Sequence, residues 1–138
     1  MGKREAWADA RLEVLARRCP DALELARLLA PAVAIDAPLL RSMRLALLPR
    51  TGAWIEAELW HSPLVKARSA GGLRFEPAVI ERLREQLAAA WQADDEGERQ
   101  RILEARGVMA AVHTGLSPAL ALEERAAAGY AEPGQRQL

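Results

Sequence analysis

Apolar residues recur at helical spacing along most of this chain, and a proline or glycine interrupts them at short intervals. Alanine and leucine supply 50 of its 138 residues, whereas valine, isoleucine and threonine together supply 12. Alanine and leucine favour helices, and strands favour β-branched residues. Because proline and glycine end helices, they divide the helical pattern into short helices. The sequence therefore predicts an all-α fold, an irregular bundle of about six or seven short helices.

The expected helices are separated by proline, glycine or capping residues. Helical periodicity covers residues 4–18, 20–30, 37–48, 53–61, 77–93, 97–114 and 118–128. Asp36 and Ser117 each precede a proline of the first turn, which is typical of a helix N-terminus. Elsewhere Gly71-Gly72 separates two short apolar segments, and a Gly-Gly pair suits the turn of a hairpin. We therefore expect a minimal hairpin near residues 64–75.

The length of the chain fits a single domain. We expect this domain to cover residues 1–130 and the polar residues 131–138 to form a disordered tail. No run of about 18 apolar residues is present, and the charged N-terminus lacks the apolar stretch of a signal peptide. The single cysteine, Cys19, cannot form an internal disulfide. These features predict a cytoplasmic protein without a membrane-spanning segment.

Charge is balanced along the chain, and this balance limits the partners. The chain holds 19 basic and 19 acidic residues. Residues 1–50 hold nine basic and six acidic groups, and residues 51–138 hold ten and thirteen. A protein that binds phosphate groups usually carries a basic excess, so the balance argues against nucleic acid as a partner. One alternative stays open, a nucleic-acid-binding accessory protein with an arginine face over residues 41–50.

The densest group of polar residues lies around His61 and carries no complete catalytic or metal-binding pattern. Glu58 and His61 have the i,i+3 spacing of a di-iron ligand pair, but such sites repeat the pair and add two carboxylates. The only other histidine is His113, and a metalloenzyme using these three residues is the weaker alternative. Ser62, like Ser117, precedes a proline, which fits a helix cap better than a hydrolase nucleophile. We expect Glu58 to pair with a nearby arginine, and His61 and Ser62 to satisfy the end of a helix. We expect no cofactor, metal or catalytic residue.

Four tryptophans stand in a chain with one phenylalanine and one tyrosine. Trp7 falls on the apolar stripe of the first expected helix. Trp54 and Trp60 lie six residues apart on one short helix, so they point to different sides. We expect Trp60 to face inward and Trp54 to face the surface or a partner, because tryptophan is enriched at the centre of protein interfaces. The candidate partner-binding residues are Trp54, Arg41, Arg44 and Arg50.

Two segments together resemble a known family. They are EAELWHSPLV at residues 56–65 and VHTGLSPALALEER at residues 112–125. Both are similar to a helical module of bacterial ternary conflict systems, which accompanies a MoxR-type ATPase and a von Willebrand A domain. The module also occurs beside formylglycine-generating-enzyme-like domains, including variable proteins of diversity-generating retroelements. The family has phenylalanine where His61 stands, which argues against a purely core role for this position.

The resemblance covers residues 21–128 and implies a non-catalytic adaptor of a defence-like system, one that links ATPase, sensor and effector proteins. It carries no catalytic residue over to this chain. The residues that it marks as a structural motif are Glu58, Trp60, His61, Ser62, His113, Ser117, Glu123, Glu124 and Arg125. Within this motif we expect His113 to form a hydrogen bond across the core and Ser117 to cap a helix. The Glu123-Glu124-Arg125 segment would then hold the last helix against the region of Trp60.

Overall fold

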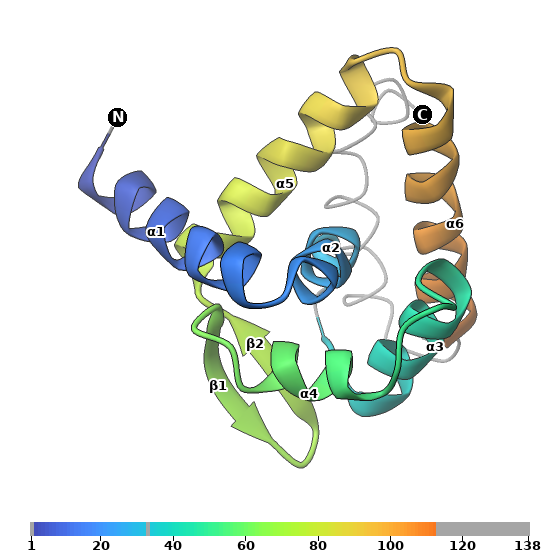
Figure 1. The fold of residues 1–138 in the computed structure, drawn as a ribbon, viewed down its shortest axis with the longest axis horizontal. Coiled ribbons are helices and arrows are strands. Elements are labelled where there is room, and N and C mark those ends of the chain that lie inside the picture. Colours follow the sequence, from blue (N-terminus) through green and yellow to red (C-terminus); the bar gives the residue numbers. More distant parts are fainter. Residues whose placement is uncertain (1, 33, 113–138) are drawn as a thin grey trace.

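The computed structural model describes residues 2–32 and 34–112, and over these residues the predicted helical fold is confirmed. Six helices and one hairpin follow each other in chain order (Figure 1). They are α1 (Lys3–Arg18), α2 (Pro20–Leu29), α3 (Ala37–Leu47), α4 (Trp54–Trp60), β1 (Val65–Ser69), β2 (Gly72–Phe75), α5 (Pro77–Gln92) and α6 (Glu96–Val112). The expected helix over 118–128 and the expected tail over 131–138 lie outside the described residues.

Local sequence signals place the helix ends. The Asp36 carboxylate accepts a hydrogen bond from the backbone N–H of Leu39 at 2.9 Å, so Asp36 caps α3 as predicted. Prolines occupy the first turns of α2, α3 and α5, where the missing N–H leaves no helical hydrogen bond unmade. Cys19 separates α1 from α2 and is buried. These residues explain why the predicted bounds of the helices lie within a residue or two of the observed bounds.

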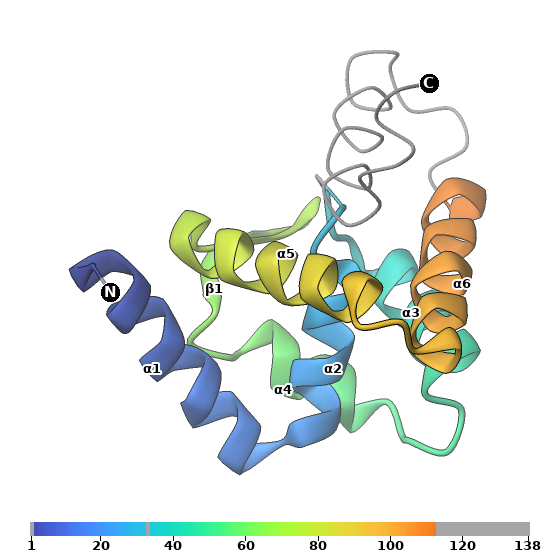
Figure 2. The same cartoon turned by 90° about the horizontal axis from the view of Figure 1, so that it is seen from above.

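Helix α2 lies at the centre of the molecule. It contacts every other described helix (Figures 1 and 2). A helix surrounded by others must be apolar on most sides. Half of the ten residues of α2 are accordingly buried, namely Ala22, Leu25, Ala26, Leu28 and Leu29.

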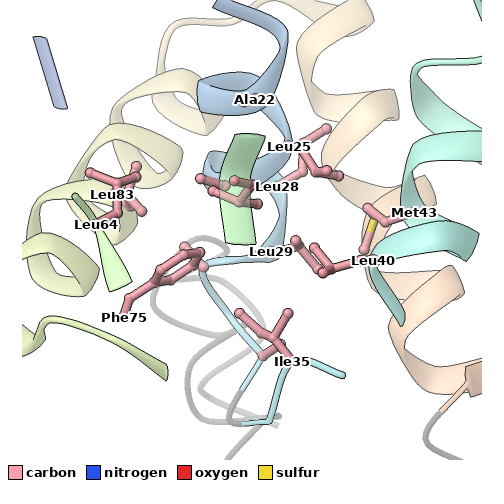
Figure 3. Packing of buried hydrophobic residues seen from close by; sticks show 14 of the residues in the cluster. Ala22, Leu25, Leu28, Leu29, Ile35, Leu40, Met43, Leu64, Phe75 and Leu83 are labelled. Atoms are coloured by element: carbon pink, nitrogen blue, oxygen red, sulfur yellow. The ribbon is translucent and has the colours of Figure 1, made fainter. Parts of the chain in front are cut away.

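One hydrophobic cluster joins all of these elements. Figure 3 shows Leu25 and Leu29 of α2 next to Met43 and Leu40 of α3, with Leu83 of α5 on the other side. Both strands and the segment before α3 also contribute side chains to the cluster. The core therefore depends on contacts between residues that are far apart in the sequence, and this fixes how α3 and α4 lie against α2.

The expected hairpin is present as an antiparallel pair of strands with a bulge near Lys66. Gly72, at the turn, has a φ of +133°, which side chains rarely adopt. Next to it, the backbone N–H of Leu73 donates to the carbonyl oxygen of Ile35 at 2.8 Å. The hairpin is thus attached along β2 to the segment before α3, whereas β1 forms the outer edge of the sheet.

Trp7 departs from the expected apolar stripe of α1. Ala8, Leu12 and Leu15 are buried, but Trp7 is exposed. The guanidinium of Arg11 lies over the Trp7 ring, 4.0 Å from its centroid. A cation–π contact at the surface therefore replaces the predicted burial, because α5 and α2 cover the neighbouring face of α1.

Ion pairs join helices that are distant in the sequence. Arg82 on α5 pairs with Asp9 on α1, with 2.8 Å between Nε and Oδ1. Arg27 on α2 pairs with Glu98 on α6, with 3.1 Å between Nη2 and Oε1. Many charges of these helices are thus neutralised by contacts within the fold. Within residues 2–32 and 34–112, no helix has the length and apolar character needed to cross a membrane.

Candidate partner-binding surface

Four exposed side chains follow each other along α3 and the turn into α4. We call them the α3–α4 surface, and they are Arg41, Leu45, Arg50 and Trp54. Trp54 is 60% exposed and Leu45 is 54% exposed, which makes them two of the largest apolar side chains in contact with solvent. The predicted exposure of Trp54 is confirmed. Leu45 was not among the sequence candidates, because the helical pattern leaves it outside the apolar side of α3 and a single exposed leucine carries no signal of a partner.

The turn before Trp54 is held by backbone and side-chain hydrogen bonds. The Thr51 hydroxyl donates to the Leu48 carbonyl oxygen at 2.6 Å, and the Thr51 N–H donates to the same oxygen at 3.0 Å. Gly52 lies so close to the indole that a Cβ there would be 2.9 Å from Cδ1 of Trp54. The turn therefore supports one side of the Trp54 ring while most of its surface stays in water.

Arg44 does not belong to this exposed surface, and the prediction that it contacts a partner together with Arg41 is corrected. Its side chain is 9% exposed, and its Nε donates to Glu56 Oε2 at 2.6 Å. Its Nη1 donates to the Thr51 carbonyl oxygen at 2.9 Å. Arg44 and Arg41 are three residues apart, but only Arg44 faces α4. Arg44 thus positions the turn and α4 relative to α3.

Glu58 forms the ion pair with an arginine that the sequence predicts. Its partner is Arg18 at the end of α1, with 2.7 Å between Nε and Oε2. The hydrogen bond from Arg18 lowers the pKa of the Glu58 carboxyl, and the nearby His61 acts in the same direction. The same hydrogen bond raises the pKa of Arg18. Glu58 therefore acts as a link between α1 and α4.

The residues that follow Glu58 have structural roles. Trp60 is half-buried and packs against the hydrophobic core, so its predicted inward orientation is confirmed. Ser62 is buried, and its Oγ accepts a hydrogen bond from the Leu64 N–H at 3.3 Å. His61 is exposed, which agrees with its departure from the phenylalanine of the resembled family.

Two arginines hold the chain where α4 ends. Arg68 of β1 donates from Nε to the Trp60 carbonyl oxygen at 2.6 Å and from Nη2 to the Ser62 carbonyl oxygen at 3.4 Å. Arg11 of α1 donates to the Pro63 carbonyl oxygen at 3.3 Å. Cations are favourable beside the carbonyl groups at a helix C-terminus. These contacts attach the hairpin and α1 to the end of α4.

The metalloenzyme alternative has no assembled metal site among the described residues. In residues 2–32 and 34–112, no three His, Cys, Asp or Glu side chains are grouped so that they could hold a metal ion. Glu58 is engaged by Arg18 instead. The remaining motif residues, namely His113, Ser117, Glu123, Glu124 and Arg125, lie outside the described part of the chain.

Basic residues are concentrated in one part of the chain, although the segments before and after residue 50 are each nearly balanced in charge. Residues 37–75, which form α3, α4 and the hairpin, contain six basic and two acidic residues. A boundary at residue 50 falls between the basic residues of α3 and those of the hairpin, so the excess is apparent only over a shorter stretch of the sequence.

Comparisons of the chain with protein-family models, with curated proteins and with solved structures give no match.

Proposed function

We propose that this chain is a non-catalytic adaptor that binds another protein through the α3–α4 surface. The observation that carries the proposal is the exposed Trp54 on a turn held by internal hydrogen bonds. A tryptophan in water forgoes the stabilisation that burial of its large apolar ring would give. Burial against a partner recovers this stabilisation.

The composition of the surface fits a protein interface. Tryptophan and arginine are the residues most enriched among those that dominate binding energy, and Arg41, Arg50 and Trp54 provide both types. The buried Arg44–Glu56 pair and the Thr51 hydrogen bonds hold the backbone before binding. A surface that is already ordered loses little conformational entropy when a partner docks.

The finer proposal is an adaptor of a bacterial ternary conflict system in the cytoplasm. Its support is the motif at residues 56–65, which is similar to the helical module that accompanies MoxR-type ATPases and von Willebrand A proteins. That motif forms most of α4 and its C-terminal connection, directly after Trp54 in the chain. The expected partners are therefore an ATPase, a von Willebrand A protein or an effector encoded by neighbouring genes.

Co-expression with the products of neighbouring genes tests the proposal, with complex formation measured by size-exclusion chromatography and light scattering. The test variants are Trp54→Ala and Leu45→Ser. Val14→Ser is the matched control, because Val14 on α1 is as exposed as Leu45, at 54%. We expect Trp54→Ala to weaken the complex at least about 30-fold, since interface hot spots contribute about 2 kcal/mol or more.

If Trp54→Ala, Leu45→Ser and Val14→Ser bind the partner with equal affinity, the interface lies elsewhere on this protein. If no neighbouring gene product forms a complex with the wild-type chain, the adaptor function is wrong. Circular dichroism of each variant shows whether the helical fold is retained.

A further inference from the structure

We infer that the partner presents an acidic segment of its chain to a basic side of this protein, formed by α3, α4 and the hairpin. This inference rests on the proposed adaptor function and specifies the chemistry of the partner. We call the cations concerned the basic side, and they are Arg41, Arg50, Lys66, Arg68 and Arg74. The argument depends on which charges the fold neutralises.

The fold neutralises its charges unevenly. Each of the two acidic residues within 37–75 is already paired, Glu56 with Arg44 and Glu58 with Arg18 from α1. Across residues 2–32 and 34–112, none of the five cations of the basic side has a carboxylate within ion-pair distance. All five belong to residues whose surfaces are exposed. Residues 37–75 thus carry four more basic than acidic groups in a chain without net charge, and the bordering acidic residues Asp36 and Glu76 reduce the excess to two over residues 36–76.

Helix α4 lies between the α3 part and the hairpin part of the basic side. Within the hairpin, Arg68 is paired with Leu73 and Arg74 with Ala67, so these two cations lie on opposite faces of the strands. Arg50 and Trp54 lie at the start of α4, and Arg68 reaches the carbonyl oxygens at its end. Figure 1 shows α3, α4 and the hairpin along one side of the molecule, and α4 contacts both α3 and β1. At about 1.5 Å per residue, α4 is about 10 Å long. About three residues of an extended peptide cover this distance.

The surface favours a protein segment over nucleic acid. Leu45 and Trp54 are exposed on the same elements as the cations, whereas contacts with a phosphate backbone are made by cationic and polar groups. The whole chain has an isoelectric point near 6.8, whereas proteins that depend on phosphate contacts are usually basic overall. Carboxylates flanked by apolar side chains complement both features of the surface. Complementary charge of this kind contributes mainly specificity and a faster encounter.

The test uses the full chain and a fluorescein-labelled peptide of about eight alternating glutamate and leucine residues. Fluorescence anisotropy measures its Kd for the wild type and for Lys66→Glu with Arg74→Glu, both exposed positions. The control is Lys3→Glu with Arg17→Glu, which changes the net charge equally at exposed positions of α1. We expect the hairpin variant to bind about tenfold more weakly and the control to stay within about twofold. Amide chemical shifts of the ¹⁵N-labelled protein should change within residues 41–75.

Equal losses in the two variants would overturn the inference, as would equal binding of a lysine–leucine peptide. Tighter binding of a 20-nucleotide oligothymidine than of the acidic peptide would also overturn it, in favour of nucleic acid. If Trp54→Ala abolishes a partner complex that the hairpin variant leaves unchanged, the acidic segment is wrong and the adaptor function stands. If the acidic peptide binds as described while no neighbouring gene product does, the adaptor function is wrong and the acidic specificity stands.

Discussion

Gly72 and Arg44 show how single residues determine the arrangement of the elements around the candidate surface. Gly72 permits β2 to approach the segment before α3, because a Cβ at this position would collide with the carbonyl oxygen of Ile35. Arg44 connects α3 to the turn and to α4 through Glu56 and Thr51. Neither residue is a contact residue of the proposed interface. Each holds a neighbouring element in the position that the surface requires.

We expect Gly72→Ala to lower the free energy of unfolding by about 1–3 kcal/mol, because the alanine must adopt a strained φ or displace Ile35. Gly71→Ala is the control, since its Cβ would have its nearest neighbour at 3.7 Å and its backbone is not in the positive-φ region. Urea unfolding followed by circular dichroism measures both. Equal stability of the two variants would contradict the close approach of β2 to Ile35.

Removal of one member of the buried Arg44–Glu56 pair should strongly lower the free energy of unfolding. Glu56→Ala leaves Arg44 buried without its carboxylate, and we expect a loss of about 3 kcal/mol in the free energy of unfolding. Glu13→Ala, which breaks an exposed pair with Arg17, should change stability by about 0.5 kcal/mol or less. The double variant Arg44→Met with Glu56→Leu should recover most of the loss, because no buried charge is then left unpaired. A loss in Glu56→Ala no larger than in Glu13→Ala would refute this account.

Sequence patterns identify some of these roles and miss others. The cap at Asp36, the exposure of Trp54 and the ion pair of Glu58 are all predicted, because each follows from residues a few positions apart or from general side-chain preferences. The burial of Arg44 is missed, because Glu56 and Thr51 belong to a different element. Helical spacing places Arg44 beside the buried residues Leu40 and Leu47, but an arginine is expected to stay in solvent unless its partner is known.

At the scale of elements, α4 is a short helix held at both ends by other parts of the chain. Arg44 of α3 holds its first turn, and Arg18, Arg68 and Arg11 hold its last turn and the chain beyond it. An isolated helix of seven residues is unstable in water, so these tertiary contacts are required for it to form. They account for the two carboxylates within residues 56–65, because Glu56 is paired with Arg44 and Glu58 with Arg18.

The link between α1 and α4 should depend on pH. Because Arg18 lowers the pKa of Glu58 in the folded protein, ionised Glu58 stabilises the fold above the ordinary pKa of 4.5, and this contribution is lost as the pH falls further. An NMR titration should give a pKa for Glu58 below 4.5. Arg18→Gln should raise this pKa, whereas Arg17→Gln, which removes the partner of Glu13, should not change it. An unchanged Glu58 pKa in Arg18→Gln would contradict the link.

The hairpin is the element that a count of β-branched residues does not anticipate. The Gly71-Gly72 pair predicts where the hairpin lies in the sequence. The segment before α3, which pairs with β2 through Ile35 and Leu73, is more than thirty residues away. That contact depends on the small size of Gly72 and on the path of the chain between α2 and α3. No local pattern contains either piece of information.

At the scale of the whole molecule, the fold surrounds α2 and separates charge. Helices α1, α2, α5 and α6 neutralise many of their charges in pairs, whereas five exposed cations of α3, the turn into α4 and the hairpin have no ion pair within the described residues. Net neutrality therefore conceals a basic side. This separation, and not the total charge, is the property that bears on partners.

Because α2 contacts every other described helix, its core residues should affect the stability of the whole domain. We expect Leu25→Ala to lower the free energy of unfolding by about 3 kcal/mol and the Tm by about 10 °C, in one cooperative transition. Leu45→Ala, at an exposed position of α3, should change stability by about 0.5 kcal/mol or less. Thermal unfolding followed by circular dichroism and tryptophan fluorescence measures both. Transitions at different temperatures for the two probes would show that the core is not one cooperative unit.

The sequence by itself determines the helices, their ends and the turn of the hairpin. These features arise from interactions between residues a few positions apart, and proline, glycine and capping residues mark them directly. The tertiary structure decides which charges are neutralised, which arginine is buried and where the exposed apolar side chains stand. Those outcomes depend on contacts between elements distant in the chain, such as Arg18 with Glu58 and Gly72 with Ile35. The candidate surface belongs to this second group, because exposure and unpaired charge are properties of the packed molecule.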